Sequence, residues 1–114
     1  MTKRRAGRAP ETFLPLTPVV FDILVSLAHE DRHGYSIITD VRERAGLTLL
    51  PGSLYRALNR LLDDGLIEEL DARPDPALDD ERRRYYRLTT LGRAVARADA
   101  ARMARQVKQA EILK

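Results

Sequence analysis

Residues 51–62, PGSLYRALNRLL, have the periodicity of an amphipathic helix, and this stretch constrains the fold of the whole chain. One face of the predicted helix is made of leucines, namely Leu54, Leu58, Leu61 and Leu62. The opposite face is polar and contains Arg56, Asn59, Arg60 and Asp63. Pro51 suits the first turn, where a missing N–H costs nothing, and Gly65 suits the helix end. A leucine-anchored helix with long outward polar side chains can lie in a DNA major groove, or it can simply be solvated.

The length and composition indicate one soluble domain. A chain of 114 residues can bury only a modest core, so part of its apolar surface can require a partner. Apolar residues make up 44% and charged residues 32%, as in folded soluble proteins. The absence of cysteine excludes disulfides and thiolate metal sites. Because no apolar run suits a membrane span or a signal peptide, we expect a cytoplasmic protein with no membrane partner.

The excess of positive charge lies at the N-terminus. The formal net charge is +3, and residues 1–10 hold four bases and no acid: Lys3, Arg4, Arg5 and Arg8. These residues are polar and interrupted by Gly7 and Pro10, so we expect residues 1–12 to form a flexible basic arm. Such an arm could lie along DNA phosphates or enter a minor groove, or it could be a solvated tail.

Two helices are expected before residue 51. Thr17 and Pro18 favour a helix start, and a broad apolar face continues to about His29. This face is wide enough to contact both the protein's own core and a second subunit. A second helix is expected from about Gly34 to Ala45, before Gly46. Together with the helix at 51–62 it forms a helix-turn-helix arrangement.

The pattern after Gly65 indicates a two-stranded wing. Residues 66–70 and 82–88 read as strands, and the segment 71–81 between them is acidic and contains two prolines. Alternation places Tyr86 and Leu88 on the core side of the second strand. The base of this wing is rich in arginine: Arg82, Arg83, Arg84 and Arg87.

A last helix is expected over residues 91–114, after Thr89 and Thr90. It has few large apolar residues, so we expect its first turns to pack on the winged domain and the rest on a second chain. The alternative is a single helix that extends into solvent. The expected organisation is therefore an arm (1–12), a winged domain (13–90) and a dimerisation helix (91–114). The predicted dimer contacts are Phe21, Leu24, Met103, Val107 and Ala110.

Four short motifs in this order resemble the PadR family of winged helix-turn-helix transcriptional regulators, in its short, single-domain form. They are His33-Gly34-Tyr35, Pro51-Gly52-Ser53-Leu54-Tyr55, Asp64-Gly65-Leu66-Ile67, and Tyr85-Tyr86-Arg87-Leu88-Thr89 followed by Gly92. The resemblance implies a mainly α (α+β) fold with a two-stranded wing and a long C-terminal helix. The chain departs from the family at Leu50, where a capping Ser or Thr is common, at Arg56, where Pro is common, and in the acidic wing segment.

The residues and the resemblance together predict a sequence-specific DNA-binding regulator. We expect Arg56 and Asn59 to face base edges and Arg60, Arg83 and Arg84 to face phosphates. Ser53 at the helix start can donate to a phosphate. The resemblance suggests that the Tyr55 hydroxyl also reaches the DNA backbone, whereas the residue pattern equally allows a core tyrosine.

The resemblance further implies a homodimeric repressor. We expect two copies of the helix at 51–62 to read a palindromic operator in double-stranded DNA. A small-molecule effector between the subunits is a further implication of the family, and no cofactor is expected.

Two other classes of function agree less well with the sequence. A dimeric winged-helix adaptor that binds proteins without affinity for DNA fits the acidic wing segment, but it does not need the outward arginines. An enzyme is disfavoured because His29 and His33 lie beside a turn and no carboxylates are spaced with them as a metal or acid–base site. We therefore expect His33 to be structural, at the start of a helix.

Overall fold

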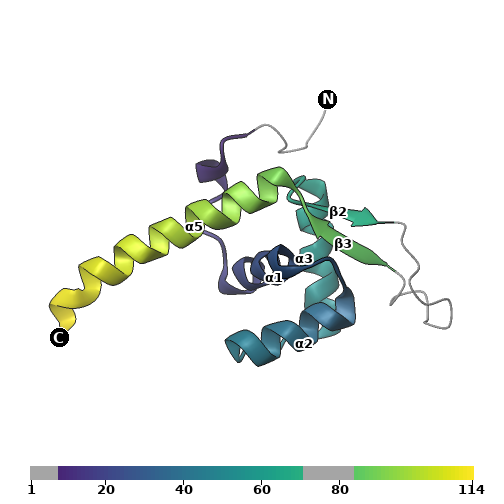
Figure 1. Ribbon diagram of the computed structural model, residues 1–114, viewed down its shortest axis with the longest axis horizontal. Helices are drawn as coiled ribbons and strands as arrows, with labels where there is room; N and C mark the ends of the chain where they lie inside the picture. Colours follow the sequence, from purple (N-terminus) through teal and green to yellow (C-terminus); the bar gives the residue numbers. More distant parts are fainter. Residues whose placement is uncertain (1–7, 71–83) are drawn as a thin grey trace.

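A computed structural model describes residues 8–70 and 84–114 (Figure 1). Three short helices and a small sheet form the body, and one long helix runs along this body and continues beyond it. The elements in chain order are η1 (Pro10–Phe13), α1 (Pro18–His29), β1 (Arg32–His33), α2 (Gly34–Ala45), α3 (Pro51–Asp63), β2 (Ile67–Leu70), β3 (Tyr85–Leu88), α5 (Thr90–Gln109) and η2 (Ala110–Leu113). The predicted winged helix-turn-helix fold is confirmed.

Residues at the helix termini explain why these elements begin and end where they do. The Thr17 hydroxyl accepts a hydrogen bond from the Val20 N–H at 3.2 Å and caps α1. His33 acts in the same way at the start of α2, because its Nδ1 accepts from the Ser36 N–H at 3.1 Å. This confirms the structural role predicted for His33. Gly46 ends α2 with a φ of 70°, a left-handed conformation that favours glycine.

The sheet is antiparallel and has the order β1-β3-β2. Leu88 pairs with Ile67 and Tyr85 with Leu70, so β2 and β3 form the predicted wing hairpin. The third strand, β1, was not predicted, because two residues are too short to show an alternating pattern. Tyr86 and Leu88 are buried, as predicted from the alternation. The expected segment 71–81, together with Arg82 and Arg83, lies outside the described residues.

The core lies where α1, α2 and α3 meet the sheet and the first turns of α5. The side chains of Leu54, Leu58 and Leu61 on α3 are at most 2% exposed, which confirms the predicted apolar stripe. The fourth leucine of the stripe, Leu62, is half-buried. Burial of one whole leucine side chain stabilises the fold by about 1.5–3 kcal/mol, so these residues fix the position of α3.

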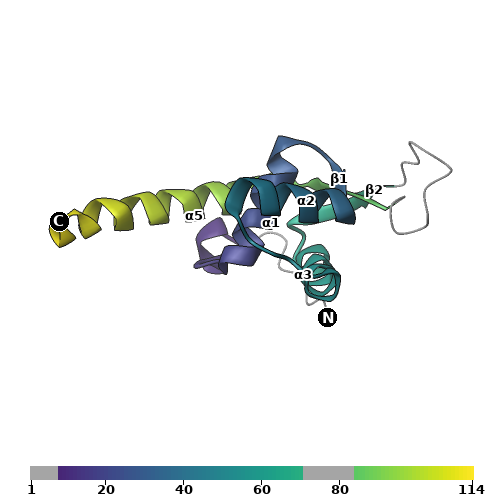
Figure 2. The same ribbon diagram turned by 90° about the horizontal axis from the view of Figure 1, so that it is seen from below.

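The first and last described elements differ from each other in packing. Residues 10–13 form the short helix η1 and contact α5, although residues 10–12 belong to the arm expected from the sequence. On α5, Val95 and Ala96 are buried in the body. Beyond Met103 the helix is exposed, and Figure 2 shows it extending past the other helices. No helix within residues 8–70 and 84–114 is long and apolar enough to cross a membrane.

A network around Arg32 ties α1, β1 and α2 together. The Arg32 guanidinium donates to the Ser26 carbonyl oxygen at 3.0 Å and to the Ser36 hydroxyl at 3.1 Å. It also contacts the Asp40 carboxylate at 3.4 Å, and Asp40 accepts a further hydrogen bond from Arg44. Burial alone would raise the pKa of Asp40, but the hydrogen bond from Arg44 and the charge of Arg32 lower it below its ordinary value of 3.8.

This lowered pKa makes part of the stability depend on pH. The ionised Asp40 stabilises the folded chain above pH 3.8, and the contribution is lost as the pH falls through the lower folded-state pKa. We expect Asp40→Asn to reduce the free energy of unfolding at pH 7 by about 1 kcal/mol, and to flatten its decline below pH 4. Urea unfolding at several pH values measures both effects. An identical acid dependence in the variant would contradict this role.

Candidate nucleic-acid interface

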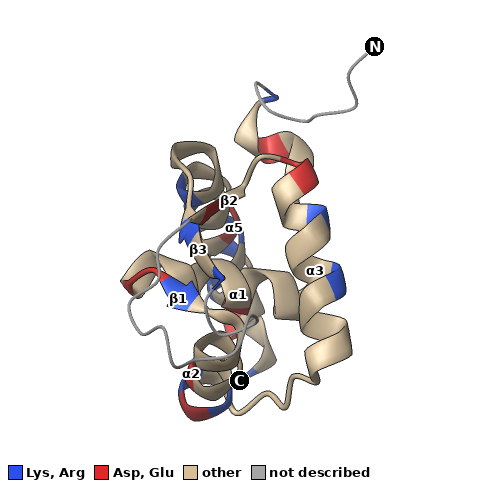
Figure 3. Ribbon diagram, turned by 90° about the vertical axis from the view of Figure 1, so that its right-hand side faces the viewer, with Lys and Arg blue, Asp and Glu red and all other residues tan. Residues whose placement is uncertain are grey.

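The polar face of α3 points away from the body. Arg56, Asn59 and Arg60 are exposed, whereas the leucines on the opposite side of the helix are buried. Figure 3 shows that the basic positions of α3 lie on its outer side. The protein thus presents two guanidinium groups and an amide on one rigid, well-anchored helix. Such groups can form bidentate hydrogen bonds with base edges or with phosphates.

The first turn of α3 brings Ser53 and Arg56 together. An Nη atom of Arg56 donates to the Ser53 hydroxyl at 3.3 Å. Leu50 occupies the N-cap position and supplies no side-chain hydrogen bond, so the helix begins without a cap. The backbone N–H groups, the positive end of the helix dipole and Arg56 therefore lie close together, an arrangement that favours an anion such as a phosphate.

The predicted phosphate contact from Tyr55 is wrong. Its hydroxyl oxygen is buried, and a Cβ atom placed on Gly34 would lie only 2.3 Å from that oxygen. The ring therefore lies across the start of α2 and cannot reach DNA. The physical reason is that position 55 flanks the apolar stripe on the side that faces α2. The alternative of a core tyrosine is the one that the structure supports, and it explains why glycine stands at position 34.

This contact leads to a prediction for Gly34→Ala. The added methyl group would overlap the Tyr55 hydroxyl, so we expect the free energy of unfolding to fall by about 1–3 kcal/mol. In a Tyr55→Phe background the overlapping oxygen is absent, and the same substitution should cost less. Chemical denaturation of the four proteins in this double-mutant cycle measures the difference. Additive effects of the two substitutions would contradict the proposed contact.

The arginines at the base of the wing are in different environments. The Arg84 side chain is 60% exposed, and its Nε lies 3.9 Å from the Glu69 carboxylate, a weak contact that leaves the guanidinium available. Arg87 instead donates from Nε and Nη to the Asp31 carboxylate at 3.3 and 3.2 Å, which joins β3 to the turn after α1. Arg83 lies outside the described residues. Among the described arginines of the wing, Arg84 is therefore the one with the weaker carboxylate contact.

The residues predicted as dimer contacts differ in their exposure to solvent. Leu24 has no exposed surface and lies in the protomer's own core, so it cannot contact a second chain, and its assignment is wrong. Leu24 points into the core, whereas Phe21, three residues earlier on the same helix, is half-buried at the surface. Phe21 lines a shallow apolar hollow of about 230 Å³ between α1 and α5. On the last helix Met103 is half-buried, and Val107 and Ala110 are exposed.

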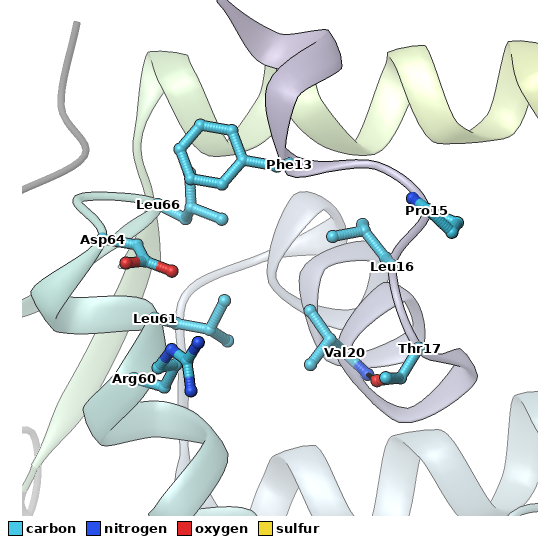
Figure 4. Close-up of a pocket in the computed structure, with 9 residues that line it drawn as sticks. All are labelled: Phe13, Pro15, Leu16, Thr17, Val20, Arg60, Leu61, Asp64 and Leu66. Carbon is cyan, nitrogen blue, oxygen red and sulfur yellow. Dashed lines mark hydrogen bonds between the residues drawn. The ribbon is translucent and has the colours of Figure 1, made fainter. Parts of the chain in front are cut away.

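A pocket beside α3 was not predicted. It has a volume of about 260 Å³ and lies between the segment that follows η1, the start of α1 and the last turn of α3 (Figure 4). Phe13, Leu16 and Val20 form part of its apolar wall, and Arg60 and Asp64 line it from α3. The apolar residues around Pro15 indicate a buried or partly buried segment, but sequence alone does not show that they face a pocket. No group of residues suited to a metal ion occurs in the described parts of the chain.

The arrangement matches a known family. Residues 23–98 match the model of the transcriptional regulator PadR-like family. The chain belongs to the PadR-like family. This confirms the resemblance seen in the four motifs, and the fold and the family are those of transcriptional regulators.

Solved structures support this assignment. A PadR family transcription regulator from Clostridium difficile is 27% identical, with a TM-score of 0.73, and the match covers 85% of this chain and 98% of that one. RosR of H. salinarum is 29% identical, with a TM-score of 0.66, over 82% of this chain and 79% of RosR. A PadR-like transcription factor from Bacteroides fragilis is 26% identical, with a TM-score of 0.67, over 84% and 89% of the two chains.

A curated relative is an uncharacterized 37.1 kDa protein in transposon TN4556 of Streptomyces fradiae. It is 36% identical over 83 residues, which make up 73% of this chain. The chain spans only 22% of that relative's length. The likeness therefore concerns only a part of that relative, and it carries no information on what the longer protein does.

Proposed function

We propose that this protein is a homodimeric transcriptional repressor that binds a palindromic operator in double-stranded DNA. The observation that carries the proposal is the outer face of α3, where Arg56, Asn59 and Arg60 are exposed opposite the buried Leu54, Leu58 and Leu61. A helix held in this way can enter a major groove without rearrangement of the core. Occupancy of an operator would block transcription, and the protein would act in the cytoplasm.

Contacts that position the protein are separate from those that read sequence. Arg56 and Asn59 are in the second and third turns of α3 and face base edges in this proposal, and each bidentate contact discriminates by about 1–3 kcal/mol. Ser53 and Arg60 lie at the two ends of the helix and contact phosphates. Arg84 is exposed at the wing and contacts the adjacent backbone, and Arg83 has the same role in the sequence-based prediction.

The dimer is proposed to form through the last helix and the neighbouring face of α1. Val107 is 69% exposed, and Ile112 and Leu113 near the C-terminus are more than 80% exposed. Exposed apolar residues on a helix that extends past its own domain favour burial against a second copy. Two α3 helices spaced by about 34 Å would then enter successive major grooves on one side of the duplex. A small-molecule effector bound between subunits would alter this spacing.

The dimer contact leads to a prediction for Val107→Lys. A charge on the proposed apolar stripe would have to be buried, so we expect the dimer dissociation constant to rise at least tenfold, by an order-of-magnitude estimate. Ala101→Lys places the same charge on the opposite side of α5 and should leave association unchanged. Sedimentation equilibrium of the two variants and the wild type measures this. Equal association of all three proteins would exclude the stripe as the interface.

The salt dependence of binding tests the function itself. Each protomer offers Arg60, Arg83 and Arg84 to phosphates, so a dimer would neutralise about six and lose about 10³-fold in affinity between 50 and 200 mM salt. Fluorescence anisotropy with a labelled duplex measures the slope. A protein-binding adaptor would show no such binding at low salt, and that result would contradict the proposal.

A further inference from the structure

The pocket beside α3 combines an apolar interior with two opposite charges, Arg60 on α3 and Asp64 at the C-cap of this helix. Figure 4 shows the side chains of Phe13, Leu16, Val20, Leu61 and Leu66 around the cavity, with Arg60 and Asp64 along the α3 side. Arg60 and Asp64 are four residues apart, so their side chains lie one above the other on the helix surface. A site of this kind has a place for a hydrocarbon group, an anion and a cation.

The volume limits the size of the molecule that fits. The pocket measures about 260 Å³. An engineered protein cavity of about 150 Å³ holds benzene, which has six carbon atoms, so the larger volume suits a molecule of about ten non-hydrogen atoms. This excludes large flat drug-like compounds and nucleotides from full occupancy, and it points to a metabolite of the size of an amino acid.

The charged residues at the pocket define the chemical class of its ligand. Within the described residues, the Arg60 guanidinium makes no side-chain hydrogen bond or ion pair, so it can pair with a carboxylate at the edge of the pocket. The Asp64 carboxylate is half-buried and has an interaction of its own. A carboxylate offers about four acceptor positions, so it can accept an ammonium group as well. We propose that the pocket binds a free α-amino acid with an apolar side chain, such as leucine.

In this arrangement the carboxylate of the amino acid pairs with Arg60 and its ammonium group with Asp64. The apolar side chain enters the cavity lined by Phe13, Val20 and Leu61. This site lies within one protomer and is separate from an effector site between subunits. If the proposed function holds, the ligand and a DNA phosphate compete for Arg60, so leucine weakens DNA binding and DNA weakens leucine binding by the same factor.

Calorimetric titration of the DNA-free protein with leucine tests the site. A small ligand of this size is expected to bind with a dissociation constant on the order of 1 mM. Isopentylamine lacks the carboxylate of leucine, and 4-methylpentanoate lacks the amine, so each should bind at least tenfold more weakly by an order-of-magnitude estimate. Equal binding of leucine and 4-methylpentanoate would show that the amine has no partner, and it would overturn the proposal.

Substitutions at and beside the pocket test whether leucine binds there. Arg60→Gln and Asp64→Asn should each weaken leucine binding at least tenfold, whereas Asp63→Asn removes a neighbouring exposed carboxylate that does not line the pocket and should have no effect. Thermal unfolding establishes that each variant is folded. A folded wild type that binds no leucine at 10 mM, about tenfold above the expected constant, overturns the inference. Because these titrations contain no DNA, their failure is distinct from a failure of the proposed function, which the salt dependence of duplex binding tests separately.

Discussion

Gly92→Ala is expected to lower the free energy of unfolding by about 3 kcal/mol or more. A Cβ atom at position 92 would lie 2.0 Å from the Leu66 carbonyl oxygen and 2.8 Å from the Leu88 Cδ1 atom. The carbonyl is part of the backbone and cannot move aside, because it also accepts a hydrogen bond from the Thr89 N–H at 3.1 Å. The added methyl group would push α5 away from the base of the wing.

Gly52→Ala is the matched control for stability. The nearest atom to a Cβ at position 52 is an Nη of Arg56 at 3.7 Å, an ordinary contact at the end of a flexible side chain. Alanine is favoured over glycine in a helix by about 1 kcal/mol, so this variant should be as stable as the wild type or slightly more stable. Guanidinium unfolding measures both proteins. A Gly92→Ala protein as stable as Gly52→Ala would contradict the close approach of α5 to residue 66.

Arg56→Ala is expected to weaken binding to a preferred operator by about 10- to 100-fold per half-site. The reason is that Arg56 is exposed on the first turns of α3 and can form a bidentate contact with a base. The loss should be much smaller for random DNA, so the ratio of specific to non-specific affinity should fall. Competition binding at fixed salt measures this ratio.

Arg105→Ala provides the control, because it removes the same charge from an exposed position of α5 that is not on the proposed DNA face. It should change specific and non-specific binding equally and only slightly. If Arg56→Ala behaves like Arg105→Ala, then Arg56 contributes charge but does not read sequence. In that case Asn59 would be the remaining residue on the outer face of α3 that could read the base sequence.

Much of the fold could be predicted because the local signals agree. Thr17 with Pro18, Gly46 and Pro51 mark helix ends that depend on local chemistry alone, and the structure confirms all of them. The leucine stripe of α3 was clear because its spacing repeats over three turns. Alternation in β3 identified Tyr86 and Leu88 as core residues for the same reason.

Features that depend on contacts between distant parts of the chain were missed. Strand β1 exists only through its pairing with β3, and the Tyr55 hydroxyl is buried because the ring lies against Gly34 at the start of α2. Asp99 is 1% exposed on α5, where Arg102 donates to its carboxylate at 2.7 Å, and no local pattern in the sequence marks this burial. Leu24 and Phe21 are adjacent on one apolar face, and only the packing shows which of them is enclosed.

The most direct test of the central claim is the selection of bound duplexes from a random DNA pool at moderate salt. If two α3 helices of a dimer read DNA, the selected sequences contain a palindrome whose half-site centres lie about 10 base pairs apart. A pool that shows no enriched sequence while salt-dependent binding persists, or one that contains a single unpaired half-site, would contradict a dimeric, sequence-specific regulator.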